Sequence, residues 1–439
     1  MTSTIPTSEV VPMDFQVSTW RRFITKFEAD EFTGWIDESV SWKTDCYIGD
    51  WSQLLKTRIR GPEAKSFLEY ISTNHWPTFT PGQAKHSIMC EDGGHVVGEG
   101  LILMLADDDF VFTSVPGVSW LTYQFTHGRK SFSATIEDVT DQWYLFQVQG
   151  PRSVELLDEI TGSTVRDIKF MSAKRLSIQG RQFWCLRQGV SGEVGFELWG
   201  PAAEGREVYD AIRQLGQRKY GLRQLGCRAK PINHVEAGFV TPALEFLSAT
   251  EGATAQLEGY REFLRGSKYA FVEKVFSRFA GNYGSQPTDH YRTPFDLGWD
   301  RLVKFDHDFI GKSALQKVAD APPNQLVTLV WDKSDVADVF SSMFTPTPFQ
   351  YMDMPRAPGG VVEGCTVSID DEIVGCAMSR CYSFWFKSML SFAIVRRDCA
   401  MVGTKVQVLW GGPNSRQKLI RAEIAKCPFK EDKRRQPLL

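Results

Sequence analysis

The sequence has no excess of either charge. Its 50 Lys and Arg residues face 53 Asp and Glu residues, which gives a formal net charge of −3 over 439 residues. A nucleic-acid binder usually shows a basic excess on some face, so this balance argues against that class of partner. Long apolar runs are also missing: the longest, near 101–105, is far too short to cross a bilayer. We therefore expect neither a nucleic-acid partner nor a membrane partner.

Patterns typical of metal sites and disulfide frameworks are absent as well. The seven histidines are scattered and form no HxxxH or HExxH motif. The nine cysteines contain no CxxC pair, and an odd number in a long chain favours reduced, buried thiols. Residues 1–10 have no cationic start followed by an apolar stretch, so no signal peptide is expected. We expect a cytoplasmic protein without a metal.

What is present is a mixture of short strands and amphipathic helices. Residues 57–60 read as a strand, Gly61-Pro62 as a turn and the following residues as a helix, and the same order recurs around Gly150-Pro151. This repeat favours two related α+β layers over a doubly wound sheet. Alternating residues after about 322 predict a β-rich C-terminal domain. A basic run from Lys430 to Arg435 is expected to be a solvated tail.

The sequence contains few motifs that are typical of a particular chemistry. No GxxxxGK[ST] sequence is present, and residues 188–192 (QGVSG) are better explained as a β-turn in a hairpin than as a nucleophile elbow. Aromatic residues make up 13% of the chain, enough to line a flat pocket as well as a core. From the residues alone, the chain is an α+β protein with an aromatic pocket.

Five short segments in a fixed order give a more specific indication of the family. They are EDGGHVVGE (91–99), QVQGP (147–151), GFELWGP (195–201), the stretch from Arg228 to Gly238, and DFIGKSAL (308–315). Together they resemble the aminomethyltransferase family, which comprises the T-protein of glycine cleavage and its folate-binding relatives. The segments FQVQGP (146–151), GWD (298–300) and KFDHDFIGK (304–312), with Trp199, are more similar to the branch of tetrahydrofolate-dependent aromatic O-demethylases.

The resemblance implies an α+β, three-domain cloverleaf fold around a central folate cavity, with tetrahydrofolate as co-substrate. The first domain would combine residues 1–60 with 142–235, and the second would combine 61–141 with 236–321. Residues 322–439 would form the β-rich C-terminal domain. The expected activity transfers the methyl group of a small methoxylated aromatic acid to N5 of tetrahydrofolate.

The family resemblance also implies roles for individual residues. Glu197 would accept two hydrogen bonds from the pterin, which presents an N–H and an exocyclic amine side by side. Gln147, Arg228 and Phe239 would also contact the folate, although an ion pair for Arg228 and core packing for Phe239 remain alternatives. Glu99 stands where T-proteins carry an acidic residue that faces the folate, and a plain turn carboxylate is the alternative.

Two departures from the demethylase pattern concern the methyl donor. Lys230 replaces a tyrosine, and it could either protonate the leaving oxygen or bind the substrate carboxylate. Trp51 stands in place of an expected histidine pair near 51–54, where it could stack on the substrate ring or belong to the core. The arginine expected after residues 110–113 is also missing. A halogenated substrate such as dicamba is then as plausible as vanillate or syringate.

Three other readings stay open at this stage. The first is an aminomethyltransferase that works with a lipoyl carrier, or a folate-linked amine demethylase. The second is a non-catalytic folate-binding protein of the iron–sulfur-assembly type, disfavoured because Gly226-Cys227-Arg228 is not its cysteine motif. The third is an interaction module, against which the intact Glu197 segment argues. The sequence carries no prediction of the oligomeric state.

Overall fold

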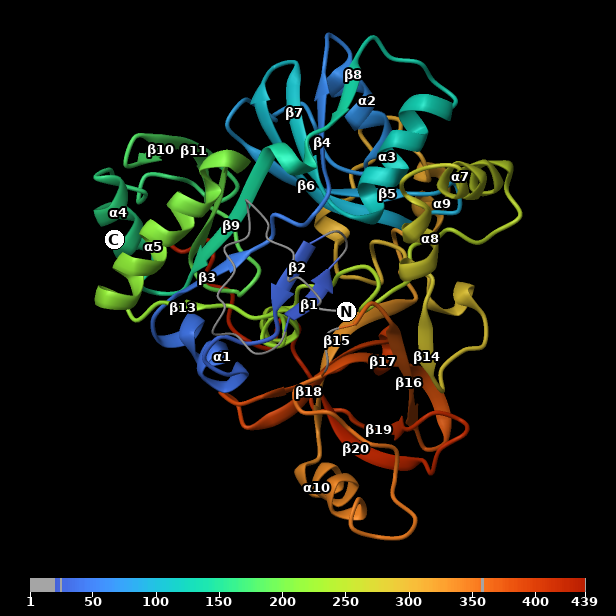
Figure 1. Ribbon diagram of the computed structural model, residues 1–439. Helices are drawn as coiled ribbons and strands as arrows, with labels where there is room; N and C mark the ends of the chain where they lie inside the picture. The colour runs from blue at the N-terminus through green and yellow to red at the C-terminus, as the bar shows by residue number, and fades with distance from the viewer. Residues whose placement is uncertain (1–19, 24–25, 357–358, 439) are drawn as a thin grey trace, which may run out of the picture.

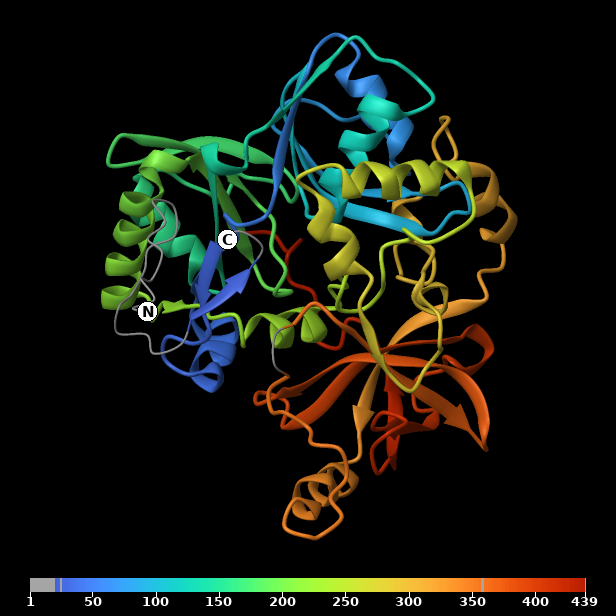
Figure 2. The same cartoon turned by 45° about the vertical axis from the view of Figure 1, so that its right-hand side comes forward.

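Three lobes, each built on its own β-sheet, surround a central region that several connecting segments cross (Figures 1 and 2). The computed structural model describes residues 20–23, 26–356 and 359–438. Residues 1–10, for which no signal peptide is expected, lie outside the described residues.

The first sheet has one apolar face, and its opposite face, which we call the polar face, carries Gln147 and Glu197 among apolar side chains such as Leu145. Its strand order is β10-β11-β12-β9-β3-β13. The strands are β3 (Tyr47–Asp50), β9 (Trp143–Gln149), β10 (Ala173–Ile178), β11 (Arg181–Leu186), β12 (Gly195–Pro201) and β13 (Arg223–Gln224). Alternate residues such as Ile48, Val148 and Phe196 pack on one side against α4 (Ser153–Thr161) and α5 (Gly205–Lys219). The polar face is therefore directed away from these helices.

The second sheet is antiparallel and is ordered β5-β6-β7-β4-β8. Its strands are β4 (Lys56–Arg60), β5 (Ala84–Cys90), β6 (Val96–Ala106), β7 (Asp109–Thr113) and β8 (Thr135–Asp138). The helices packed with it are α2 (Ala64–Ile71), α3 (Pro116–His127), α7 (Ala255–Arg265) and α8 (Ala270–Phe276). Helix α3 lies against β6 where two glycines meet: a Cβ on Gly98 would lie 2.5 Å from the Cα of Gly117. Larger residues at these positions would push the helix off the sheet.

The third sheet closes on itself. Its order is β14-β16-β17-β18-β15-β20-β19, and an added pairing of β16 with β19 completes a ring of six strands. The strands are β14 (Phe279–Gly281), β15 (Asn324–Trp331), β16 (Val362–Ile369), β17 (Glu372–Ser383), β18 (Ser388–Arg396), β19 (Lys405–Trp410) and β20 (Lys418–Ala425). Helix α10 (Lys333–Ser342) protrudes from this lobe at the bottom of Figure 1. The predicted β-rich C-terminal region is confirmed.

Shorter elements join the lobes. They are β1 (Trp20–Phe23), β2 (Lys26–Ala29), α1 (Trp35–Thr44), α6 (Lys230–Ala237), α9 (Lys312–Val318) and the 3-10 turns η1 (Thr140–Gln142), η2 (Ala202–Glu204), η3 (Pro287–His290), η4 (Asp300–Leu302) and η5 (Arg397–Cys399). The predicted repeat of strand, Gly-Pro turn and helix is confirmed in β4–α2 and β9–α4. The prolines lie one residue before the N-caps, Glu63 and Arg152.

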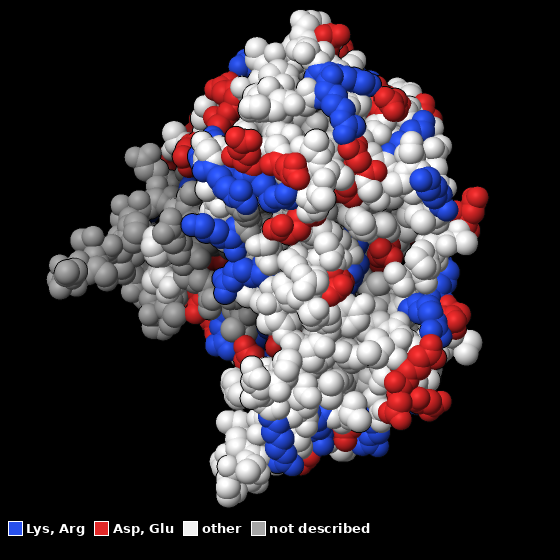
Figure 3. All heavy atoms as spheres, turned by 90° about the vertical axis from the view of Figure 1, so that its right-hand side faces the viewer, with Lys and Arg blue, Asp and Glu red and all other residues white. Residues whose placement is uncertain are grey.

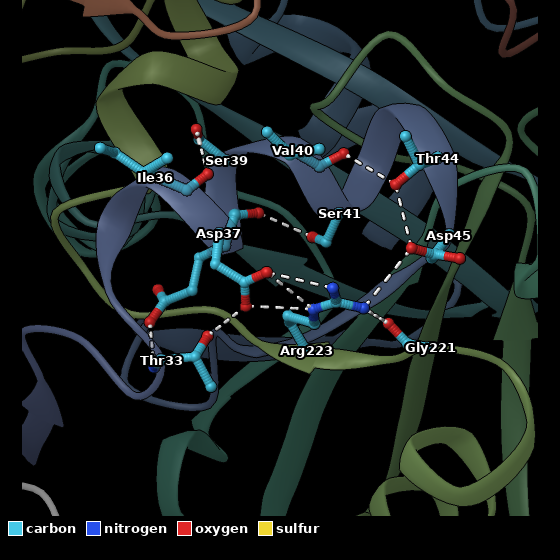
Figure 4. Close-up of polar contacts among 11 residues, drawn as sticks. Thr33, Ile36, Asp37, Ser39, Val40, Ser41, Thr44, Asp45, Gly221 and Arg223 are labelled. Atoms are coloured by element: carbon cyan, nitrogen blue, oxygen red, sulfur yellow. Dashed lines mark hydrogen bonds and ion pairs between the residues drawn. The ribbon is translucent and has the colours of Figure 1, made fainter.

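Helix α1 is joined to the edge of the first sheet by one guanidinium group (Figure 4). Arg223 of β13 donates to Asp37 of α1 over 3.0 Å and pairs with Asp45 just after the helix over 3.4 Å. The guanidinium also donates to the carbonyl of Gly221. These contacts lower the pKa of the Asp37 carboxyl, chiefly through the hydrogen bond from Arg223. The short parallel pair β13–β3 is thereby held at the sheet edge.

The sheets differ from the predicted domain ranges at two strands. Strand β4, within the predicted range 1–60, pairs with β7 and β8 of the second sheet. Strand β14, within the predicted range 236–321, pairs with β16 of the third sheet. The division into 1–60 with 142–235, 61–141 with 236–321, and 322–439 remains our proposal, with those two strands assigned to the sheets in which they pair.

The basic run near the C-terminus is not a solvated tail, so that expectation was wrong. Lys430 is 7% exposed, and its ammonium pairs with Glu193, whose side chain is 6% exposed. The backbone N–H of Lys430 donates to the carbonyl of Glu236 over 2.8 Å. The segment therefore returns to the first sheet and to α6, where it is packed and hydrogen-bonded.

Helix α6 is fixed by a buried ion pair that joins three parts of the chain. The Glu236 carboxylate lies 2.6 Å from the Lys43 ammonium of α1, and both side chains are at most 3% exposed. Its other oxygen accepts a hydrogen bond of 2.6 Å from Ser383 of β17. A buried carboxylate needs such partners, because an uncompensated charge in the interior is very unfavourable. Glu236 thus ties α1, α6 and the third sheet together.

Replacement of Lys43 by methionine should destabilise the protein strongly. It keeps the volume of the side chain but leaves Glu236 as an unpaired buried charge, so we expect a loss of about 3–5 kcal/mol in the free energy of unfolding. Urea titration followed by circular dichroism measures it. The double variant Lys43→Met/Glu236→Gln, which removes both charges, should recover most of this loss. A double variant as unstable as Lys43→Met would show that the pair is not the anchor of α6.

Candidate active site

The polar face of the first sheet presents a row of functional side chains. Glu197 of β12 is paired in register with Gln147 of β9, and Gln147 is paired in register with Gly49 of β3. Because side chains alternate along a strand, this row points away from the apolar core under α4 and α5. Gln147 and Gln149 point to the same side: the Gln149 amide donates to the side-chain oxygen of Gln147 over 2.8 Å.

Glu197 is buried and held by three donors. Its Oε1 accepts from Nε2 of Gln147 over 2.9 Å and from Nε2 of Gln188 over 3.2 Å. Its Oε2 accepts from the indole N–H of Trp199 over 3.1 Å. Burial nevertheless dominates and raises the pKa of the Glu197 carboxyl to about 7. The carboxyl therefore titrates near neutral pH and responds to any new donor placed against it.

Two glycines make room for the rest of the network. A Cβ at Gly189 or Gly195 would lie 2.4 Å from the side chain of Gln149. With hydrogen atoms there instead, the Gln149 amide fits between the two backbones and accepts from the N–H of Ser191 over 3.1 Å. Small residues are thus required around this glutamine, and the loop between β11 and β12 is bound directly to the sheet face.

Gly49, the last member of the row, is covered by an indole. A Cβ at Gly49 would lie 2.1 Å from the ring of Trp51, so only glycine lets this ring lie on the strand. The ammonium of Lys230 lies 4.6 Å from the centroid of the same ring. This is a cation–π geometry. Lys230 also pairs with Glu28 of β2 and donates to the carbonyl of Asp50 over 3.3 Å. The structure brings together Trp51 and Lys230, which were predicted separately.

One helix links these groups to the second sheet. Helix α6 begins with Lys230-Pro231 and ends at Gly238, which adopts a φ of 71° that favours glycine. Asn233, one turn after Lys230, donates to the Tyr47 hydroxyl over 3.1 Å, and Tyr47 in turn donates to Gln147 over 3.4 Å. The helix therefore connects the cation on Trp51 with the Glu197 row.

His234 follows Lys230 by four residues and therefore lies on the same side of α6. Both of its ring nitrogens are buried and hydrogen-bond to no other residue in the described ranges. Burial, assisted by the charge of Lys230, lowers the pKa of His234 to about 4, so the imidazole is neutral at pH 7. The ring centroids of His234 and Phe239 are 5.4 Å apart. Phe239, which follows the end of α6, thus lies beside this helix.

Glu99 belongs to the same neighbourhood through a histidine. Its carboxylate lies 2.8 Å from Nε2 of His86, which stands on the adjacent strand β5. The His86 ring is stacked against Phe239 with a centroid distance of 6.4 Å, and it meets Trp299 edge to face at 5.0 Å. A series of ring contacts therefore runs from the second sheet to α6.

Arg228 is the predicted residue least connected to the others. Its guanidinium donates to Glu31 over 2.8 Å, and both side chains are about one-third exposed. No hydrogen bond or ring contact found in the described part of the chain joins it to Glu197, Lys230 or Glu99. This arrangement is the ion pair that the sequence left open as an alternative.

Several site residues were not found from the sequence. They are Tyr47, His86, Gln188, Asn233, His234 and Glu28. The Pro at the start of α6 and the Gly at its end were a usable signal for the helix, and the helix would have placed Asn233 and His234 beside Lys230. Gln188 was read only as part of a turn, and the strands β11 and β12 confirm the hairpin. Glu28 carried no local signal, because its partner is 202 positions away.

One cavity lies apart from this site. The cavity, of about 300 Å³, lies between α3, β8, α7 and the connection from α7 to α8, and none of the predicted site residues lines it. Among the residues described, no group of three His, Cys, Asp or Glu side chains could hold a metal, and no helix could span a membrane. On the face drawn in Figure 3, basic and acidic residues are interspersed. All nine cysteines are free thiols, and seven are buried.

Comparison with known proteins gives one consistent result. Residues 11–261 match the family described as the GCVT N-terminal domain. The syringate O-demethylase of Sphingobium sp. (strain NBRC 103272 / SYK-6) is 30% identical over 420 residues, which cover 91% of this chain and 89% of the relative. The sesamin methylene transferase of Sinomonas sp. (strain No.22) is also 30% identical, with the same coverage. An aminomethyltransferase of Thermotoga sp. (strain RQ2) is 24% identical over 91% of the chain.

A solved structure agrees at the level of the fold. The glycine cleavage system aminomethyltransferase T from Bartonella henselae superposes with a TM-score of 0.68 at 17% identity, over 95% of each chain. The α+β, aminomethyltransferase-like fold predicted from the sequence is confirmed. The chain belongs to the GCVT (aminomethyltransferase) family. It is a tetrahydrofolate-dependent methyltransferase.

The polar face of the first sheet fits the pterin ring of tetrahydrofolate. A pterin edge offers N–H donors, and a complementary site must offer acceptors. Besides the Glu197 carboxylate, Oε1 of Gln188 and Oδ1 of Asn233 are buried and accept no hydrogen bond from any described residue. Unsatisfied buried acceptors are unfavourable unless a ligand satisfies them. This set of acceptors is the observation that supports placing the pterin beside Glu197.

The raised pKa of Glu197 leads to a prediction for stability. Since the folded protein holds this proton up to about pH 7 and the unfolded chain releases it near 4.5, the free energy of unfolding falls as pH rises between these values. The interval corresponds to roughly 3 kcal/mol. Glu197→Gln abolishes this titration. Relative to wild type, the variant should therefore gain stability, on the order of 3 kcal/mol, between pH 5 and pH 8.

Urea unfolding at the two pH values measures this difference, and any constant effect of the substitution cancels. Glu155→Gln, at an exposed position of α4, is the matched control and should show no such gain. If Glu197→Gln and wild type keep the same difference in stability at both pH values, the Glu197 carboxyl does not titrate as described.

Proposed function

We propose that this protein transfers the methyl group of a methoxylated aromatic acid to N5 of tetrahydrofolate, giving 5-methyl-tetrahydrofolate and a phenol. The bond between the ether oxygen and the methyl carbon breaks, and a bond between N5 and that carbon forms. The proton that N5 loses balances the proton that the phenolate gains. The two relatives that are 30% identical to this chain, a syringate O-demethylase and a sesamin methylene transferase, support this proposal.

The observation that carries the proposal is the position of Lys230 on Trp51. This cation and flat ring lie at the end of the same row that holds Glu197 and Gln147. An indole offers a stacking surface to an aromatic ring, and an ammonium offers a donor to an anionic oxygen. An aromatic acid bound there would lie next to a pterin bound at Glu197. In-line alignment of the two substrates would supply much of the rate.

In this proposal Lys230 donates a proton to the leaving oxygen, and Trp51 supports the substrate ring. Glu28 holds the ammonium in place, since the ion pair fixes an otherwise flexible side chain. The competing role for Lys230 is to bind the substrate carboxylate. The two roles differ in whether turnover or substrate affinity depends on the residue.

The folate side of the site would use the remaining predicted residues. Glu197 and Gln147 accept and orient the pterin, and Phe239 places an aromatic ring near it. Glu99, paired with His86, is a carboxylate–imidazole couple that could orient the folate amine or receive its proton. For Arg228 we propose an indirect contribution, since it is paired with Glu31.

The aminomethyltransferase relatives keep a second donor class in view. Their name, aminomethyltransferase, denotes the transfer of an aminomethyl group rather than of an ether methyl group. The sesamin relative adds a methylene donor. The cation at Lys230 favours an anionic leaving group over a cationic amine donor, so we rank the aryl ether first.

Anaerobic incubation with tetrahydrofolate and a panel of methoxylated benzoates tests the proposal. The panel includes vanillate, syringate, 3-O-methylgallate and dicamba, together with a methylenedioxy-aromatic compound and an N-methyl amine. We expect 5-methyl-tetrahydrofolate by mass spectrometry with at least one methoxybenzoate. Glu197→Ala is the control: it should bind tetrahydrofolate more weakly by about 1.5–3 kcal/mol, the range for a charged hydrogen-bonding partner. Product from the amine alone would replace the demethylase reading with the aminomethyltransferase one.

Replacement of Lys230 separates its two possible roles. As the proton donor, Lys230→Met should lower kcat by at least about 100-fold, the usual range for a general acid, while the affinity for tetrahydrofolate is retained. Lys230→Arg keeps the cation over Trp51 but is a poor acid, so it should retain the substrate KM and not kcat. Lys219→Met, which removes an exposed charge on α5, is the matched control. Full turnover in Lys230→Arg with a raised KM in Lys230→Met would instead assign the substrate carboxylate to Lys230.

A further inference from the structure

The segment that follows the last strand runs back across the molecule. Residues 427–438, which we call the strap, leave β20 of the third sheet and reach the first sheet, as the red trace in Figure 2 shows. The Phe429 ring meets Phe386 edge to face at a centroid distance of 4.9 Å. Pro428 lies against the end of α6: a Cβ on Gly238 would be 2.9 Å from the Pro428 Cβ. The start of the strap is therefore packed between the third sheet and α6.

The middle of the strap is bonded to the loop between β11 and β12. Lys430 pairs with Glu193 of this loop, and both side chains are buried. The backbone N–H of Lys433 donates to the carbonyl of Gly192 over 2.8 Å.

Two guanidinium groups add further hydrogen bonds between the strap and this loop. Arg434 donates to the carbonyl of Gly189 over 3.1 Å. In the opposite direction, Arg187 at the start of the loop donates to the carbonyl of Arg434 over 3.0 Å. The loop is thus held by the strap at Arg187, Gly189, Gly192 and Glu193.

The other side of the same loop forms part of the folate site. Gln188 donates to Glu197, and the backbone of Ser191 donates to Gln149. Gln188 also presents the unpaired acceptor Oε1. Within 187–193, the residues bonded to the strap lie directly beside Gln188 and Ser191, which are bonded to the folate site. Any shift of the strap contacts therefore moves Gln188 relative to Glu197. A loop outside regular structure needs such contacts to hold one conformation.

We propose that Lys430 and Arg434 are positioning residues of the tetrahydrofolate site, which act through Glu193 and Gly189 to hold Gln188 against Glu197. The strap pre-organises the acceptor edge that receives the pterin, so the ordering of the loop is complete before the folate binds. Neither residue touches the reacting atoms. Their contribution is to folate affinity, and it is independent of the methyl donor.

Calorimetric titration of tetrahydrofolate into the full-length variants tests this assignment. We expect the Kd to rise about tenfold in Lys430→Met and about threefold in Arg434→Met. Lys430→Arg, which keeps the charge opposite Glu193, should restore most of the affinity. Arg435→Met is the matched control, because Arg435 is an exposed cation on the same strap that lies against the Phe170 ring and, within the described structure, makes no hydrogen bond to residues 187–193. Its Kd should stay within twofold of wild type.

Steady-state kinetics distinguish positioning from a general loss of structure. The KM for tetrahydrofolate should rise in parallel with the Kd, while kcat stays within about twofold, since uniform binding is what the strap supplies. A purely structural role would lower the melting temperature and leave the Kd of the folded fraction unchanged, which would overturn the proposal. If Lys430→Met does not fold, Arg434→Met decides by the same criteria. The binding readout needs no methyl donor, so a silent methoxybenzoate panel would not affect it.

Discussion

The buried carboxylate of Glu236 is the contact on which the arrangement of the centre depends. It pairs with Lys43 of α1 and accepts from Ser383 of β17, and its own carbonyl accepts from the N–H of Lys430. One residue of α6 is therefore bonded to three segments that are far apart in the sequence. Since α6 also carries Lys230 and Asn233, the position of this carboxylate sets where the cation over Trp51 stands relative to the Glu197 row.

The row itself follows from an ordinary property of strands. One face of the first sheet is apolar and packs on α4 and α5, so the alternate residues must face the centre. Polar side chains there are buried, and they are stable because they bond to one another: Gln149 to Gln147, and Gln147 to Glu197. The network remains incomplete at Gln188 and Asn233, whose free acceptors suit a ligand rich in donors.

Local patterns in the sequence predicted much of this, and long-range pairs did not. Alternation and Gly-Pro turns predicted β4, β9 and the helices after them, and the motif around Glu197 indicated the family. Trp51 and Lys230 were singled out as departures, but nothing local indicated that Gly49 makes room for the indole on which the ammonium lies. The solvated-tail reading of Lys430 failed because its partner Glu193 is fixed only by the tertiary fold. A run of charged residues predicts an exposed segment only when the fold places no buried opposite charge beside it.

Three lysine–carboxylate pairs surround α6: Lys43–Glu236, Lys230–Glu28 and Lys430–Glu193. A buried ion pair adds little net stability, because desolvation offsets most of the attraction, but misplacing either partner leaves an unpaired charge and is strongly unfavourable. Pairs of this kind therefore select one arrangement of the segments they join. Here the pairs join α6 to α1 and to β2, and join the strap to the loop between β11 and β12. Hydrophobic contacts alone would tolerate small sliding of a short helix, whereas methyl transfer between two bound substrates does not. The ion pairs around α6 are thus suited to alignment rather than to stability.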